Sequence, residues 1–118
     1  MKTYSIVGMN FRNSENFVMN LKDGAPAVLV REPNNQFDAN AVAVYVDGTH
    51  VGYVPKKTNA ALAQFIDQSG TATTMNGTPL ESAKDILGMD SDLQRTKSIT
   101  AKFTRSPNSG YPQVTIND

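Results

Sequence analysis

The chain has 118 residues, of which 39% are hydrophobic, and eleven basic residues balance eleven acidic ones. This length supports one hydrophobic core, so we expect a single domain over residues 1–118 of ordinary globular composition. With a net charge of zero, no general positive field draws the chain to nucleic acid. Any such binding has to come from a local patch or a shaped pocket.

Several kinds of site are disfavoured by residue type. The chain has no cysteine, which excludes disulfides and cysteine-based zinc sites, and its one histidine, His50, is expected to be a solvated turn residue. Gly-x-Ser-x-Gly and glycine-rich phosphate loops are absent. Glu32, Asp38 and Asp47 lack the Glu-x-Lys spacing of a two-metal nuclease. We therefore expect no enzyme activity, no metal and no cofactor.

The hydropathy pattern gives no sign of a membrane segment. No apolar run approaches the length of a transmembrane helix, and residues 1–10 lack the apolar core of a signal peptide. We expect a cytoplasmic protein with no membrane partner.

The first elements alternate strand, helix and strand. Tyr4 to Phe11 predicts a strand, and Ala27 to Arg31 predicts another. Between them, Phe17, Val18 and Leu21 share one helical face. This pattern predicts a short helix capped by Asn13 or Ser14 and ended by Asp23-Gly24.

A β-hairpin is the clearest local prediction. Residues 41–46 and 49–54 are rich in valine and flank an Asp47-Gly48 turn. Two-residue turn geometry places Val42, Val44, Val46, Val51 and Tyr53 on one face. Ala43 and Gly52 then meet on the other face, where another backbone packs closely or a ligand rests. A longer loop would flip the register of one strand.

The rest of the chain predicts two helices and further short strands. A helix from Thr58 or Asn59 to Gly70 would bury Ala61, Leu62, Phe65 and Ile66, and a second helix near 79–87 begins at a capping box, Thr78-Pro79-Leu80-Glu81. Strands are expected at 71–75, at 99–104 and around Val114 and Ile116. Several short strands favour a mainly β fold closed into a small barrel.

The run from Arg31 to Ala41, Arg-Glu-Pro-Asn-Asn-Gln-Phe-Asp-Ala-Asn-Ala, carries the strongest functional signal. Proline, asparagine and aspartate favour an ordered turn, which is called the motif turn below (residues 32–41). One interpretation is a structural turn whose polar groups satisfy each other. The other is a binding loop at the mouth of a strand, presenting Arg31, Phe37 and Asp38.

Aromatic and basic residues gather near this turn in sequence. Single-strand binders stack bases on aromatic rings and meet phosphates with basic side chains. The candidates here are Phe11, Phe37 and Tyr53 with Arg12, Arg31, Lys56 and Lys57. The alternatives are core packing for each aromatic and a solvated helix start for the lysines, although lysines there oppose the helix dipole.

Three consecutive features carry a resemblance to the HIRAN family over residues 7–70. They are the motif turn, the run Val51-Gly52-Tyr53-Val54-Pro55-Lys56-Lys57 and the Ala/Leu-rich helix that follows it. Gly-Tyr-x-Pro is closest to stand-alone HIRAN domains of the bacterial or phage type. The resemblance implies a six-stranded, OB-like β-barrel with two to three short helices, which residues 71–118 would complete around the inserted helix near 79–87.

The resemblance also implies a ligand. Eukaryotic HIRAN domains capture the 3′ end of single-stranded DNA, and an aspartate at the position of Asp38 accepts a hydrogen bond from the terminal hydroxyl. Phe37 takes the place of a stacking tyrosine, and Lys56 that of a phosphate-binding lysine.

Besides Phe37, three positions depart from the eukaryotic pattern. The Arg-Tyr pair of those domains falls on Asn10-Phe11, so Arg12 would have to replace the arginine, which needs a regular strand. Their histidine falls on Tyr53.

Two functions follow from these patterns. The first is a DNA-binding module for single-stranded 3′-hydroxyl ends, serving DNA repair or replication. The second is a protein-interaction module that uses the same face for a DNA-processing partner or for a second copy.

Overall fold

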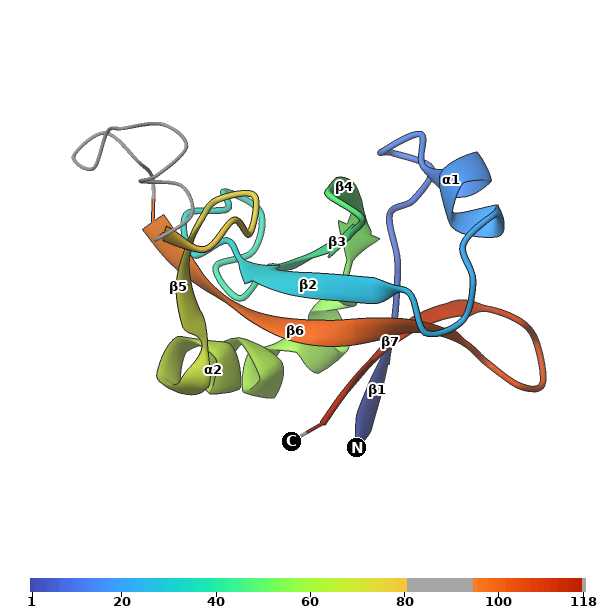
Figure 1. Ribbon diagram of the computed structural model, residues 1–118. Coiled ribbons are helices and arrows are strands. Elements are labelled where there is room, and N and C mark those ends of the chain that lie inside the picture. The colour runs from blue at the N-terminus through green and yellow to red at the C-terminus, as the bar shows by residue number, and fades with distance from the viewer. Residues whose placement is uncertain (81–94, 118) are drawn as a thin grey trace.

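The computed structural model describes residues 1–80 and 95–117 (Figure 1). In chain order its elements are β1 (Lys2–Ser5), α1 (Glu15–Met19), β2 (Pro26–Arg31), β3 (Val42–Val46), β4 (Thr49–Tyr53), the 3-10 helix η1 (Lys56–Thr58), α2 (Asn59–Ser69), β5 (Thr71–Thr74), β6 (Arg95–Arg105) and β7 (Pro112–Ile116). Within these ranges, no helix combines the length and apolarity needed to cross a bilayer.

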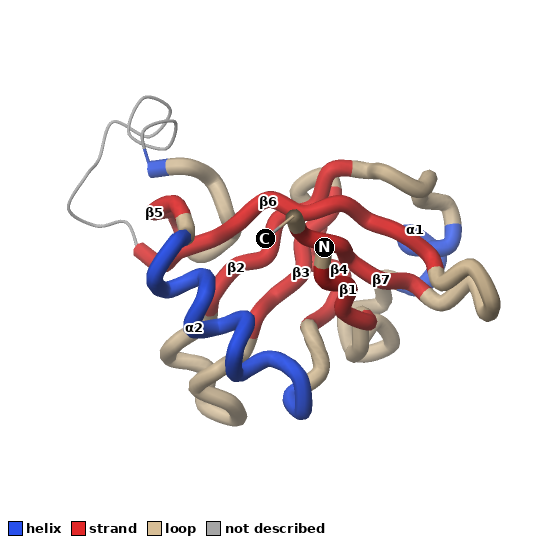
Figure 2. The backbone as a smooth tube through the Cα atoms, turned by 90° about the horizontal axis from the view of Figure 1, so that it is seen from below, coloured by secondary structure: helices blue, strands red, loops and turns tan. Residues whose placement is uncertain are grey.

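The strands form one antiparallel sheet in the order β1-β7-β6-β2-β3-β4, and β5 pairs with the start of β6. The sheet is strongly curled, and α2 lies across one side of it (Figure 2). Val7 and Tyr53 exchange two backbone hydrogen bonds of 2.8 Å, which join the β1 end of the sheet to β4. The mainly β, OB-like barrel class with flanking helices is confirmed. The described residues contain seven strands where six were expected, because β5 forms an additional short strand along Arg95–Ser98 of β6.

The core lies inside this curl. Leu29, Val44 and Phe103 are fully buried on three neighbouring strands, and Leu62 and Ile66 of α2 pack into the same cluster. On β6 the buried Phe103 lies between Lys102 and Thr104, as expected for a strand with one buried face, whereas β2 and β3 are mostly apolar and largely buried on both faces.

The first strand is shorter than expected. β1 ends at Ser5, and Gly8 has a φ of +80°, a conformation that favours glycine. The amides of Phe11 and Arg12 then donate to the carbonyl of Gly8, so the chain turns where a strand to Phe11 was expected. The helix expected between the cap at Asn13 or Ser14 and the end at Asp23-Gly24 is likewise shorter, because it is limited to α1.

The hairpin forms as expected, but its register shifts at a bulge between Val44 and Tyr45. Tyr53 therefore lies opposite Ala43, and Gly52 lies opposite Val44. The prediction that Tyr53 shares a face with the valines of the hairpin is therefore wrong. A Cβ on Gly52 would lie 2.4 Å from the Val7 carbonyl oxygen, so the small residue serves close packing by another backbone.

α2 has a different inward stripe from the one expected. Asn59, Leu62, Ala63 and Ile66 are buried, which is the i, i+3, i+4, i+7 face. Ala61 and Phe65 lie at the flank of this stripe, and Phe65 is 37% exposed.

The second predicted helix, near 79–87, lies outside the described residues from Glu81 onward. Before it, Pro79 bridges to Thr73. A Cβ on Gly77 would lie 3.2 Å from Val28, so the turn before Pro79 folds back toward β2.

Gly52→Ala should destabilise the fold, because the added methyl group meets backbone that can move only by breaking the Val7–Tyr53 bridge. Overpacking of this kind costs about 1–3 kcal/mol. Urea melts of this variant and of Thr49→Ala, an exposed position on the same strand, provide the measurement. The control should change the free energy of unfolding by less than about 0.5 kcal/mol. Equal stability of both variants would contradict the close approach.

Truncation of Phe103 and of Phe65 to alanine should lower the free energy of unfolding by different amounts. Phe103 is fully buried, so Phe103→Ala should lower the free energy of unfolding by about 3–5 kcal/mol. Phe65 is 37% exposed, so Phe65→Ala should lower it by clearly less. Chemical melts of the two variants compare them directly. A larger loss for Phe65→Ala than for Phe103→Ala would contradict this view of the core.

Candidate functional site

The motif turn is anchored by a buried arginine. Arg31, at the end of β2, is 5% exposed. Its guanidinium donates to the carbonyls of Ala39 (3.0 Å) and Ala41 (2.9 Å), and to the Asp67 carboxylate on α2 (3.0 Å). Since a buried cation needs acceptors for its donors, these contacts fix the turn against the helix. Arg31 points into the protein and not toward the surface of the motif turn.

Hydrogen bonds within the turn hold its tip. The Asn35 side-chain oxygen accepts from the amides of Phe37 and Asp38 at 2.9 and 3.1 Å, which is an Asx-type arrangement. The Asn35 side-chain amide donates to Glu32, and the Tyr53 hydroxyl donates to the same carboxylate oxygen at 3.0 Å. Glu32 thus ties the turn to β4.

Asp38 lies between the turn and the start of α2. Its Oδ1 accepts from the Asn40 amide (2.9 Å), and its Oδ2 accepts from the side-chain amide of the buried Asn59 (2.8 Å). The Asn59 hydrogen bond, followed by that of Asn40, lowers the pKa of Asp38, and the charge of Lys56 acts in the same direction. Asp38 is therefore an anion at neutral pH.

Three rings form an aromatic face on the outside of the β3–β4 hairpin: Tyr45, His50 and Tyr53. The rings of Tyr45 and His50 are stacked, with centroids 4.7 Å apart, and Tyr53 meets His50 edge-on at 4.9 Å. Burial and the Glu32 hydrogen bond raise the pKa of Tyr53 to about 12. Burial lowers the pKa of His50, so the ring is neutral at pH 7. His50 is a half-buried residue that stacks on Tyr45, so the prediction of a solvated turn residue is wrong.

Residues 10–12 lie in the turn after the Val7 bridge. Asn10 and Arg12 are exposed, and the Phe11 side chain is 87% exposed. The positive charge of Arg12 contributes to the pKa shifts of Tyr45, His50 and Tyr53, which places it near the aromatic face although the strand is not regular.

Phe37, Lys56 and Lys57 are the remaining predicted site residues, and all three are exposed near the motif turn. The Phe37 side chain is 82% exposed at the tip of the motif turn, next to Asp38. Lys56 and Lys57 are exposed in η1, just before α2. The structure therefore brings together Phe37, Asp38 and Lys56 at one end of the surface, and Arg12 and Tyr53 at the other.

Three contributors escaped the sequence analysis. Tyr45 and His50 are paired across the hairpin, a relation that the two-residue turn predicts. Asn59 was considered only as a helix cap, whereas its side chain holds Asp38. No cluster of three or more potential metal ligands occurs within residues 1–80 and 95–117.

Comparison with known families gives a match to the HIRAN domain over residues 2–86. The chain belongs to the HIRAN domain family. HIRAN domains are in general DNA-binding and are not catalytic on their own. The matched range extends the resemblance of residues 7–70 at both ends.

Comparison with solved structures supports the fold. A crystal structure of a protein from Lactobacillus plantarum is similar with a TM-score of 0.62 and 18% sequence identity, covering 98% of this chain and 88% of that one. Comparison with curated proteins gives no match.

Asn59→Ala should raise the pKa of Asp38 toward that of an ordinary aspartate, 3.8, because the Asn59 amide is the largest stabiliser of the carboxylate. NMR titration of the Asp38 carboxyl carbon measures this shift. Asn40→Ala is the matched control, since Asn40 contributes its backbone amide. A lowered folded pKa adds stability that is present above pH 3.8 and is lost as the pH falls through the folded value. This acid-labile stability should shrink in Asn59→Ala, and an unchanged Asp38 pKa would contradict the assignment.

Proposed function

We propose that this HIRAN domain binds single-stranded DNA at a 3′-hydroxyl end, with the motif turn as its binding surface. The observation that carries the proposal is the ionised Asp38, held by Asn59 and Asn40 beside the exposed ring of Phe37 and close to Lys56. These are an acceptor, a stacking platform and a cation within one surface.

The protonation state of Asp38 suits a hydroxyl. An ionised carboxylate only accepts hydrogen bonds, and its two oxygens offer about four lone-pair sites. Two of these are used by Asn40 and Asn59, which leaves capacity for a sugar hydroxyl. A 3′-phosphate would bring a second negative charge to the same place. Asp38 therefore favours a 3′-hydroxyl over a 3′-phosphate.

The aromatic and basic residues supply the remaining contacts. Phe11 and Phe37 are unusually exposed for phenylalanine, and each offers a face on which a base can stack. Arg12, Lys56 and Lys57 are exposed cations for phosphates. Arg31 positions the motif turn, because its guanidinium donates to Ala39, Ala41 and Asp67. Tyr53 also has a positioning role, because its hydroxyl donates to Glu32.

Fluorescence anisotropy with oligonucleotides ending in 3′-hydroxyl or 3′-phosphate tests the proposal. The wild-type domain should prefer the hydroxyl end, and Asp38→Asn should lose that preference while remaining folded. Asp47→Asn is the matched control, since Asp47 lies in the hairpin turn with a φ of 50° that asparagine tolerates. End preference that survives in Asp38→Asn would remove Asp38 from the site.

The affinity for DNA should depend weakly on salt, because only three of the candidate phosphate-binding residues are exposed cations: Arg12, Lys56 and Lys57. Each phosphate neutralised on a single strand contributes about −0.7 to the slope of log affinity against log salt, so the slope should be about −2. Lys56→Ala should reduce it by one contact, and Lys102→Ala on β6 should leave it unchanged. Phe37→Ala should weaken binding by about 1–3 kcal/mol at every salt concentration, because stacking is not screened.

The same surface is open to a protein partner, and the experiment separates the two functions. Absence of binding to either oligonucleotide at low salt would exclude the DNA function. The exposed Phe11 and Phe37 would then favour an interaction with a DNA-processing protein at this surface.

A further inference from the structure

β6 has a stretch of edge that no described strand covers. β2 pairs with β6 from Ser98 to Lys102 along one edge. On the opposite edge, β5 pairs as far as Ser98 and β7 begins to pair at Lys102. Residues 99–101 are therefore paired with β2 alone.

The backbone groups of Thr100 face this open edge. Phe103 donates to the Ala25 carbonyl (2.8 Å) and accepts from the Gly24 amide (2.7 Å), both before β2. Ser106 donates to the Tyr111 carbonyl on the β7 side (2.9 Å). Because the groups of an antiparallel strand point alternately to its two edges, the even-numbered residues face β5 and β7. The N–H and C=O of Thr100 thus point into the gap.

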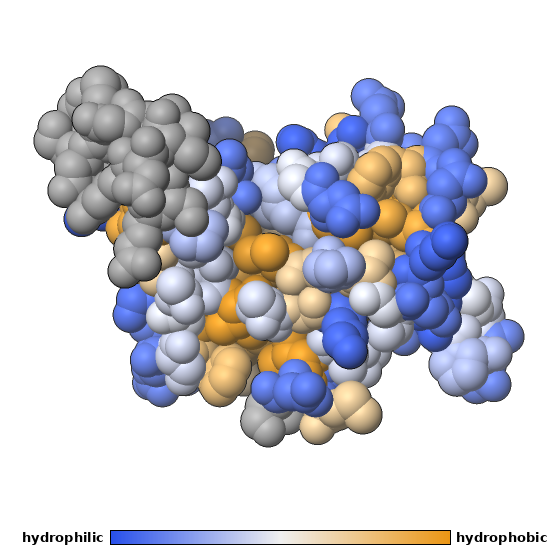
Figure 3. All heavy atoms as spheres, in the orientation of Figure 1, coloured by the Kyte–Doolittle hydropathy of each residue, from blue (hydrophilic) through white to orange (hydrophobic). Residues whose placement is uncertain are grey.

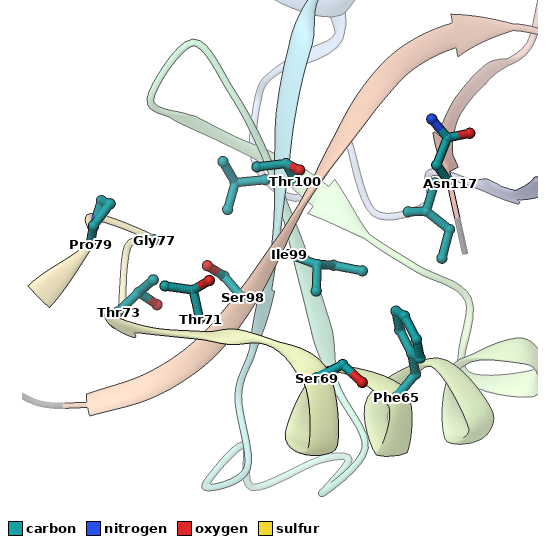
Figure 4. Close-up of a pocket in the computed structure, with 12 residues that line it drawn as sticks. Phe65, Ser69, Thr71, Thr73, Gly77, Pro79, Ser98, Ile99, Thr100 and Asn117 are labelled. Carbon is teal, nitrogen blue, oxygen red and sulfur yellow. The ribbon is translucent and has the colours of Figure 1, made fainter.

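A groove of about 440 Å³ lies at this gap (Figure 4). Val28, Phe65, Ile99 and Ile116 form most of its apolar part, and its polar part consists of serine and threonine side chains and Asn117. None of its described lining residues has an ionisable side chain. Figure 3 shows hydrophobic surface in the middle of the face where β2 and β6 lie in front, with hydrophilic residues around it. The groove suits an uncharged ligand.

A buried hydroxyl in the groove has no partner. Thr73 of β5 lines it and is 1% exposed, and within the described part of the chain its Oγ1 makes no hydrogen bond. Buried polar groups are normally paired. Thr73 lies opposite Thr96, outside the stretch from Ser98 to Lys102, so within the described residues the N–H and C=O of Thr100 are the backbone hydrogen-bonding groups that the gap offers.

We propose that this groove binds a short extended segment of a partner protein, which adds to β6 as a strand between β5 and β7. Its central residue would exchange two backbone hydrogen bonds with Thr100, as in other cases of strand addition. From Ser98 to Lys102 the gap spans about 13 Å at about 3.3 Å per residue, which fits three or four residues.

The charges set the chemistry of the segment. Its centre should be uncharged and apolar, as the lining is. Lys102 is exposed and follows Thr100 by two residues, so it lies on the same side of the strand. An acidic residue at the N-terminal end of an antiparallel segment would lie near Lys102.

The probe is the peptide acetyl-Glu-Val-Thr-Val-amide, titrated into the ¹⁵N-labelled domain and followed by NMR. At saturation, the Thr100 amide should shift and exchange with solvent at least tenfold more slowly. An analogue N-methylated at its two central residues should not bind, since it cannot donate to the Thr100 carbonyl. Replacing Glu by Gln in the peptide should weaken binding severalfold.

Lys102→Gln tests the charged contact at the N-terminal end of the peptide. The variant should be as stable as the wild type, because Lys102 is exposed, and should bind the peptide severalfold more weakly. Thr49→Val, on the exposed side of β4, is the control and should bind normally.

Each of three results with the peptide would overturn the proposal: no shift of Thr100 at millimolar peptide, equal binding of the N-methylated analogue, or unchanged affinity in Lys102→Gln. Protection of the Thr100 amide by self-association without peptide would also overturn it, in favour of a second copy as the occupant.

Discussion

The guanidinium of Arg31 determines where the candidate site lies relative to the barrel. It joins the end of β2 to the carbonyls of Ala39 and Ala41 and to Asp67 on α2. A buried charge is tolerated only when its donors are paired, so the turn and the helix are held together. Asp38 depends on this arrangement, because its partner Asn59 belongs to the same helix as Asp67. Arg31 thus shapes the surface from inside the protein.

The elements of the fold were predictable from local patterns, whereas their details were decided by distant contacts. Valine alternation around Asp47-Gly48 predicts the hairpin, and the Ala/Leu-rich run predicts α2. The bulge in the hairpin and the early end of β1 are accompanied by the close approach of Val7 to Gly52. That contact joins segments about 45 residues apart, which periodicity does not register.

The site shows the same division. Phe37, Lys56 and Arg12 lie on the surface near the motif turn, in agreement with their positions in sequence. The inward direction of Arg31 could not be predicted, because its carboxylate partner lies 36 residues further along the chain. Asn59 was hidden for a similar reason: an asparagine at the start of a helix predicts a cap, and only the folded chain brings it to Asp38.

The two interpretations of the motif turn, structural or functional, are compatible in physical terms. Glu32, Asn35 and Arg31 bond to several of its backbone and side-chain polar groups, as a structural turn requires. The same bonds leave Phe37 exposed and Asp38 ionised in a fixed position. A ligand that meets such a surface orders few groups on binding, and the smaller entropy loss adds to affinity. A domain with a net charge of zero gains little from long-range attraction, so a rigid surface is the means by which this chain can bind a charged strand.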